Sequence, residues 1–280
     1  MRSIAWDVNG RKVFAVASGS GEPVLLLHGY PQSASCWRNQ IAALADNHQV
    51  VAPDWPGFGR SDPPATPQTY DNEVDRIEWL VQRLGWQRFN LCSHDYGGFL
   101  GLGYVIRHPE RVLRLALLNT RAHGIFRPRF YRFSLGQHWV ATRPLLSAAA
   151  RHLPLAHVHH VALARYRRIG CFDTALEAEY LDWMNTPRGR RTFWEFFAHY
   201  PVPAVPWLAD GLATIPCPVA IIWGDRDPYI PFDTARELAD RIPHATLIQL
   251  RGGDHYIMEE RPREVTDALL SLLNVAAVPR

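Results

Sequence analysis

The sequence predicts an α/β protein, in which a mostly parallel, twisted sheet carries helices on both faces and an inserted helical cap. Three observations support this class. Short apolar runs alternate with amphipathic stretches in the first third of the chain. The alternation stops between about residues 121 and 211, where no convincing strand is found, and it resumes at residue 219. We therefore expect a core of residues 1–121 and 212–280 and a helical cap of residues 122–211.

The apolar runs predict strands at residues 13–17, 24–27, 49–52, 89–92, 112–118, 219–223 and 246–249. Several of these runs are continuous, as is typical of parallel strands that are buried on both faces. Amphipathic spacing predicts helices at residues 37–45, 72–84, 96–108, 233–241 and 263–273. The strands after the cap are too few for a sheet of their own, so we expect them to join the first sheet.

The composition excludes several classes of function. The formal charge is +3, Lys12 is the only lysine, and no basic cluster with interleaved aromatic residues indicates nucleic-acid binding. The cysteines form no CxxC pair, which argues against zinc and against a disulfide scaffold (Cys36, Cys92, Cys171, Cys217). No signal peptide and no apolar stretch of membrane-spanning length is found, so we expect a cytoplasmic protein without a membrane partner.

The stretch NLCSHDYGG at residues 90–98 lies between an expected strand and an expected helix. A nucleophile elbow places its central residue on a strained strand-to-helix turn, where small residues are needed two positions before and after it. Centred on Asp95, those positions hold Ser93 and Gly97, which are both small. Centred on Ser93, they hold Leu91 and Asp95, which fit badly. The spacing favours a carboxylate nucleophile, although this turn alone would also suit an Asp95 that only caps the helix.

This stretch resembles the elbow of the aspartate-nucleophile branch of the α/β-hydrolase superfamily, which contains epoxide hydrolases and haloalkane and haloacetate dehalogenases. The resemblance extends over nearly the whole chain. Its other motifs are HGYP at residues 28–31, DWPGFGRS at 54–61, WGDRD at 223–227 and GDH at 253–255.

The resemblance implies a role for each of these motifs. Asp95 would be the nucleophile, His255 the general base that activates water, and Asp227 the acid that holds the imidazole. Asp225 is the rival for this last role, but the family pattern favours the later aspartate. The backbone N–H groups of Tyr30 and Tyr96 would form the oxyanion hole.

A carboxylate nucleophile suits displacement at a saturated carbon and gives an alkyl-enzyme ester, which His255-activated water then cleaves. This chemistry requires only water, so neither a metal nor an organic cofactor is expected. A non-catalytic ligand-binding protein on the same fold is a less favoured alternative, because the set of Asp95, Asp227 and His255 is intact.

The cap should determine the leaving group. By resemblance, His138 and Tyr200 would donate hydrogen bonds to an epoxide oxygen, or His138, Trp139 and Tyr200 would hold a departing halide. Tyr96 and Phe99 stand where haloacetate dehalogenases carry arginines. We therefore expect an epoxide hydrolase that gives vicinal diols, with a haloacetate or haloalkane dehalogenase as the alternative. The substrate would be a small epoxide or organohalide, and a monomer or a homodimer are both compatible with the sequence.

Overall fold

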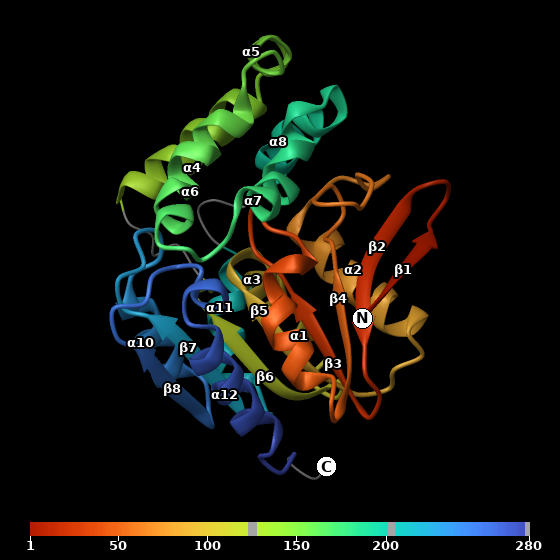
Figure 1. The fold of residues 1–280 in the computed structure, drawn as a ribbon, viewed down its shortest axis with the longest axis vertical. Coiled ribbons are helices and arrows are strands. Elements are labelled where there is room, and N and C mark those ends of the chain that lie inside the picture. The colour runs from red at the N-terminus through yellow and green to blue at the C-terminus, as the bar shows by residue number, and fades with distance from the viewer. Residues whose placement is uncertain (123–127, 201–204, 278–280) are drawn as a thin grey trace.

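The computed structural model describes residues 1–122, 128–200 and 205–277 (Figure 1). One eight-stranded sheet has the order β1-β2-β4-β3-β5-β6-β7-β8. Strand β2 is antiparallel to both of its neighbours, and all the other pairs are parallel. The strands are β1 (Arg2–Asp7), β2 (Lys12–Ser18), β3 (Glu22–Leu27), β4 (His48–Pro53), β5 (Phe89–His94), β6 (Val112–Leu118), β7 (Val219–Gly224) and β8 (Ala245–Leu250).

This arrangement confirms the predicted fold class. Every residue of β5 and β7 is buried, as their continuous apolar sequences require. The strands after the insertion join the first sheet, because β7 pairs with β6. Strand β1 was not predicted from the sequence.

The helices of the core alternate with the strands. Helix α1 packs against α12, and α2 packs against α3. Helix α2 buries Val74, Ile77 and Val81, which recur at helical spacing. It begins at an N-cap, where the Thr69 side chain accepts the N–H of Asn72. These elements are η1 (Ala34–Trp37), α1 (Arg38–Leu44), α2 (Tyr70–Arg83), α3 (Asp95–Arg107), α10 (Phe232–Arg241), α11 (Ile257–Glu260) and α12 (Pro262–Leu273).

Between β6 and β7 the described residues form helices and no strand. Figure 1 shows α4, α5, α6 and α8 grouped at one end of the molecule, beyond the sheet. The boundaries of a cap at residues 122 and 211 stay a prediction. No helix among the described residues is long and apolar enough to span a membrane. The inserted elements are α4 (Pro128–Ala141), α5 (Pro144–Ala150), α6 (Leu155–Arg168), α7 (Thr174–Leu181), η2 (Asp182–Asn185), α8 (Pro187–His199), α9 (Pro206–Gly211) and η3 (Leu212–Thr214).

Candidate active site

The turn between β5 and α3 presents Asp95 at the carboxyl end of the sheet. Asp95 has a φ of 47°, a left-handed conformation that costs a non-glycine residue about 1–3 kcal/mol. Its surroundings admit only small residues. A Cβ at Gly97 would lie 2.6 Å from the backbone oxygen of His28, and a Cβ at Gly29 would lie 2.5 Å from the Asp95 Cβ. Ser93 is buried and its hydroxyl donates to the Ala116 carbonyl at 3.1 Å.

Hydrogen bonds fix one side of the Asp95 carboxylate. Its Oδ1 accepts the Tyr30 N–H at 2.8 Å, and the Tyr96 N–H also donates to the carboxylate. The Thr120 hydroxyl donates to the Asp95 backbone carbonyl at 2.6 Å. Burial raises the pKa of Asp95, and His255 and the two backbone donors counteract this effect. The backbone donors predicted for the oxyanion hole therefore face an oxygen of the predicted nucleophile.

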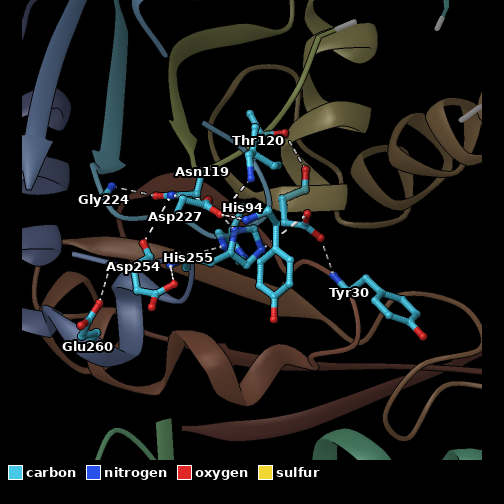
Figure 2. A network of polar contacts seen from close by, with 12 residues as sticks. Tyr30, His94, Asn119, Thr120, Gly224, Asp227, Asp254, His255 and Glu260 are labelled. Carbon is cyan, nitrogen blue, oxygen red and sulfur yellow. Dashed lines mark hydrogen bonds and ion pairs between the residues drawn. The ribbon is translucent and has the colours of Figure 1, made fainter. Parts of the chain in front are cut away.

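His255 lies between Asp95 and Asp227, and Figure 2 shows it beside Asp227. Its Nδ1 donates to Asp227 Oδ2 at 2.7 Å, and its Nε2 lies 3.7 Å from Asp95 Oδ2. Burial lowers the pKa of His255, but the charges of Asp227, Asp95 and Asp254 and the Asp227 hydrogen bond outweigh it and raise the pKa to about 9. At neutral pH the imidazole is therefore cationic.

Asp227, rather than its rival Asp225, lies beside the imidazole. The Asp225 carboxylate instead accepts from the Gln249 side chain and the Gly252 N–H. Asp227 is buried, and its Oδ1 accepts the N–H groups of Tyr229 and Ile230 at 2.7 and 2.9 Å.

Asn119 is a contributor that the sequence analysis did not identify. It follows β6 directly, has a φ of 37°, and donates to Asp227 Oδ2 at 2.7 Å. Its own side-chain oxygen accepts the N–H of Gly224 at 3.1 Å (Figure 2). Its position after a strand end, like that of Asp95 after β5, is the sequence signal that could have found it.

A cavity of about 310 Å³ opens beside Asp95 and His255. Its wall is mainly aromatic, and it includes residues of α4, α6 and α8 as well as of the strand ends. The lining residues are Tyr30, Pro31, Asp95, Tyr96, Phe133, Ser134, Val158, His159, Ala162, Leu163, Phe196, Phe197, Tyr200, Pro228, Tyr229, His255 and Tyr256.

Of the residues predicted to bind the leaving group, Tyr200 lines this cavity. Its hydroxyl oxygen accepts from Arg121 Nε at 3.1 Å, because a guanidinium only donates. Arg121 is buried between the rings of Phe99 and Tyr200, with its Cζ 4.0 and 4.9 Å from their centroids. No pattern in the sequence indicated a role for Arg121.

His138 and Trp139 lie elsewhere, contrary to the expectation. His138 Nδ1 donates to the Phe197 carbonyl at 3.0 Å, and neither side chain lines the cavity. The Trp139 side chain is 52% exposed and lies under the Arg143 guanidinium. His138 lies one helical turn beyond Ser134, which lines the cavity together with Phe133, so it is on the same side of α4 but further along the helix.

His159 occupies the place that was expected for His138. It lines the cavity, and its Nδ1 donates to the Leu155 carbonyl at 3.0 Å. Its Nε2 therefore accepts the hydroxyl hydrogen of Tyr30, whose oxygen lies 2.8 Å away. Burial lowers the pKa of His159, which keeps this ring neutral.

Comparisons with known proteins also identify α/β hydrolases as the relatives of this chain. The model of the alpha/beta hydrolase fold family matches residues 22–262. The chain is 29% identical over 277 residues to a cis-3-alkyl-4-alkyloxetan-2-one decarboxylase of Shewanella oneidensis, covering 92% of this chain and 83% of that protein. It is 25% identical over 287 residues to epoxide hydrolase 3 of Xenopus tropicalis, covering 95% and 75%. The solved structure of a Bacillus megaterium epoxide hydrolase with an inhibitor superposes with a TM-score of 0.81 at 20% identity, covering 97% and 100%.

Proposed function

Because this chain belongs to the alpha/beta hydrolase fold family, we propose that it is a hydrolase whose Asp95 carboxylate opens an epoxide through a covalent alkyl ester. The observation that carries this proposal is the way in which the two carboxylate oxygens differ. Oδ1 is held by the Tyr30 N–H at 2.8 Å, whereas Oδ2 lies 3.7 Å from His255 Nε2 beside the cavity. One oxygen is anchored and the other is left to react.

In the first step Asp95 Oδ2 attacks a ring carbon, the ring C–O bond breaks, and the departing oxygen takes a proton from a phenol. Tyr200 suits this role because its oxygen accepts from Arg121, which directs its own hydrogen elsewhere. Tyr30 suits it less well, because its hydroxyl hydrogen is engaged by His159. Burial raises the pKa of Tyr200 and Arg121 counteracts this rise, so the phenol is protonated before the reaction.

Formation of the ester removes the negative charge of Asp95. Because that charge contributes to the raised pKa of His255, the imidazole becomes more acidic once the ester has formed. Its proton can then restore the Tyr200 phenol, which leaves a neutral base. The same covalent step thus prepares His255 for the next one.

In the second step neutral His255 takes a proton from water as the water oxygen attacks the Asp95 Cγ. Negative charge develops on Oδ1, to which the Tyr30 N–H already donates, and the Tyr96 N–H donates to the same carboxylate group. The Cγ–Oδ2 bond then breaks, the diol oxygen takes the proton held by His255, and the new carboxyl group returns a proton to the imidazole. The sum is one epoxide and one water converted into one diol.

The lining of the cavity favours an oxygen ring over an organohalide. Among the described lining residues there is no arginine, lysine, tryptophan or asparagine, whereas five are tyrosines. A haloacetate would require a cation for its carboxylate, and a leaving halide would require N–H donors. Hydroxyl donors suit an oxygen that becomes an alkoxide.

A second candidate substrate is a cis-3,4-dialkyl oxetan-2-one, favoured by the relative in Shewanella oneidensis, which covers 92% of this chain. This ring is also strained and also holds its oxygen on a saturated carbon. Attack by Asp95 at that carbon would open it by the same displacement and release a carboxylate. Loss of CO₂ from the resulting ester would give an alkene and return Asp95 without water.

The proposal is tested by assaying the purified protein with styrene oxide, a cis-3,4-dialkyl oxetan-2-one, a bromoalkane and fluoroacetate. We expect diol from the epoxide, which Asp95→Asn should abolish. His255→Gln should form the ester but fail to hydrolyse it, so intact-protein mass should rise by the mass of one epoxide.

Two outcomes would contradict the epoxide assignment. Halide release without any diol would indicate a dehalogenase, and alkene with CO₂ from the oxetanone alone would indicate the second candidate. A His255→Gln protein that acquires no adduct from any of the four compounds would contradict the covalent mechanism itself.

A further inference from the structure

The helices α4 to α6 carry a surface that the proposed chemistry does not use. Apart from Met1 and Val275 near the ends of the chain, the exposed large apolar side chains among the described residues all lie between residues 133 and 169. They are Phe133, Trp139, Leu145, Leu146, Leu153, Val158, Val161 and Ile169, and the exposed fraction reaches 88% at Leu145. A concentration of this kind indicates an interaction surface, since isolated exposed apolar residues are otherwise scattered.

The same segment is also strongly basic. Residues 128–172 contain seven arginines and no aspartate or glutamate, which leaves 23 of the 30 lysines and arginines and all 27 acidic residues elsewhere. The rest of the chain is therefore net acidic. Arg132, Arg151 and Arg168 are exposed, and none of them forms an ion pair with a residue that the structure describes. We call this surface, defined by the exposed apolar and arginine side chains of residues 132–169, the basic apolar surface.

Helix α6 shows how the two features combine. Val158 and Val161 follow one another at helical spacing, Arg168 lies two turns beyond Val161, and all three are exposed. Helix α6 already buries an apolar face with Leu163 and Tyr166, so its exposed valines are additional to the side that normally packs on the core. Helices with apolar and arginine side chains on an exposed face are typical of proteins that lie in the interfacial layer of a membrane.

The cavity beside Asp95 reaches this surface. Its lining includes Phe133 from α4 and Val158 from α6, whose side chains are 40% and 55% exposed. Figure 1 shows α4, α5 and α6 together at the end of the molecule that is remote from α12 and the C-terminus. An apolar compound dissolved in a bilayer could therefore reach the cavity without crossing water.

We propose that the basic apolar surface binds anionic phospholipid bilayers. A bilayer satisfies both features, because its acyl layer accepts the apolar side chains and its anionic headgroups attract the arginines. A second copy of this chain fits less well, since two such surfaces would bring twelve arginines together. This binding departs from the expectation that the protein has no membrane partner, and it does not depend on the reaction at Asp95.

The test is co-sedimentation of the full chain with vesicles of phosphatidylcholine alone or with about a quarter of phosphatidylglycerol. We expect the protein to sediment with the anionic vesicles and to stay in solution with the neutral ones. The triple variant Arg132→Gln/Arg151→Gln/Arg168→Gln should weaken binding to anionic vesicles at least about tenfold. The triple variant Leu145→Ser/Leu153→Ser/Val161→Ser should also weaken it, because these side chains would enter the acyl layer.

A matched control changes the same charge elsewhere. Arg83, Arg88 and Arg251 are exposed arginines that lie outside the inserted helices. The variant in which all three are replaced by Gln should bind anionic vesicles like the native chain. Thermal unfolding of each variant checks that it is folded, which is expected because all the changed side chains are exposed.

Four outcomes would overturn the proposal. The first is a native chain that stays in solution with both kinds of vesicle, and the second is a control that loses as much binding as the Arg132/Arg151/Arg168 variant. The third is a native dimer that the Leu145/Leu153/Val161 variant converts into a monomer, with no change in vesicle binding, which would assign the surface to a second copy. Retention on immobilised polyglutamate without vesicle binding would likewise assign it to an acidic protein.

Discussion

At the scale of single residues, the protonation of His255 is the feature with the widest consequences. Its pKa in the folded protein is about 9, against an ordinary value of 6.5 in the unfolded chain. The native state therefore binds this proton more tightly than the unfolded state does. The resulting stabilisation, about 3 kcal/mol, is complete below pH 6.5 and is lost as the pH rises through 9.

A first prediction follows for stability. In His255→Gln the free energy of unfolding should decline less between pH 6.5 and 9 than in the native chain, because the variant has no proton to lose there. Urea denaturation at several pH values measures both slopes. Equal slopes would show that the imidazole is not held in its cationic form.

A second prediction concerns the leaving-group donor. Tyr200→Phe removes the hydroxyl that Arg121 orients, and kcat/KM for an epoxide should fall by about 100-fold. His138→Gln is the matched control, because that side chain lies outside the cavity lining and its loss should leave kcat/KM within about twofold. The reverse ranking would restore His138 to the mechanism and remove Tyr200.

A third prediction concerns Asn119. Replacement by leucine leaves Asp227 without one of its buried donors and leaves the Gly224 N–H without its acceptor. We expect a loss of about 1–3 kcal/mol in stability and a lower kcat. As a readout specific to positioning, the pH profile of kcat should shift, because the Asp227 carboxylate holds the pKa of His255.

At the scale of elements, the turn from β5 into α3 is defined by close backbone contacts. In Gly97→Ala the new Cβ would meet the carbonyl oxygens of Leu27 and His28 at 2.7 and 2.6 Å, and neither can rotate away. We expect a loss of at least about 2 kcal/mol in the free energy of unfolding. Gly136→Ala in α4 is the control, because no atom lies within 4 Å of its Cβ, and it should stabilise the protein by about 0.5–1 kcal/mol. Urea denaturation of the two variants provides the comparison.

The elements differ in how far the sequence predicts them. Seven of the strands were predicted because their apolar runs are continuous, and strand β1 was missed because none of its residues is fully buried. The resemblance to α/β hydrolases, epoxide hydrolases among them, is confirmed. Asp95, Asp227 and His255 lie within reach of one another because each of them follows a strand of the sheet.

The inserted helices set the limit of what the sequence could predict. The spacing of His138 from Asp95 indicated that it could approach the cavity, but it did not determine which turn of α4 would line the cavity. That choice depends on packing against α8, which α4 contacts closely. For the same reason His159 and Arg121 were not identified, since each acquires its role through a contact with a distant tyrosine.

At the scale of the whole molecule, helix α6 is joined to the loop that carries His255. The Tyr166 hydroxyl donates to the buried Asp254 Oδ1 at 2.6 Å, and the same oxygen accepts the N–H of His255 at 2.7 Å. Arg165 forms an ion pair with the other oxygen of Asp254. We therefore expect movement of α6 to be coupled to the position of the imidazole.

This coupling gives a further prediction. Tyr166→Phe removes one hydrogen bond to a carboxylate and should reduce the free energy of unfolding by about 1.5–3 kcal/mol. Amide hydrogen exchange should accelerate both in α6 and in the loop at residues 253–256. Acceleration confined to α6 would show that the two segments move independently.

The hydrogen-bonded Oδ1 of Asp95 also limits the classes of compound with which the carboxylate can react. A serine hydrolase leaves its pair of amide donors vacant until an incoming carbonyl fills them, whereas here the enzyme's own side chain is already bound there. The carbonyl oxygen of an ordinary carboxylic ester or thioester therefore has no free backbone N–H donors to polarise it. Under the proposed function, such compounds should not be hydrolysed, and the Asp95 carboxylate would react with strained rings rather than with acyl esters.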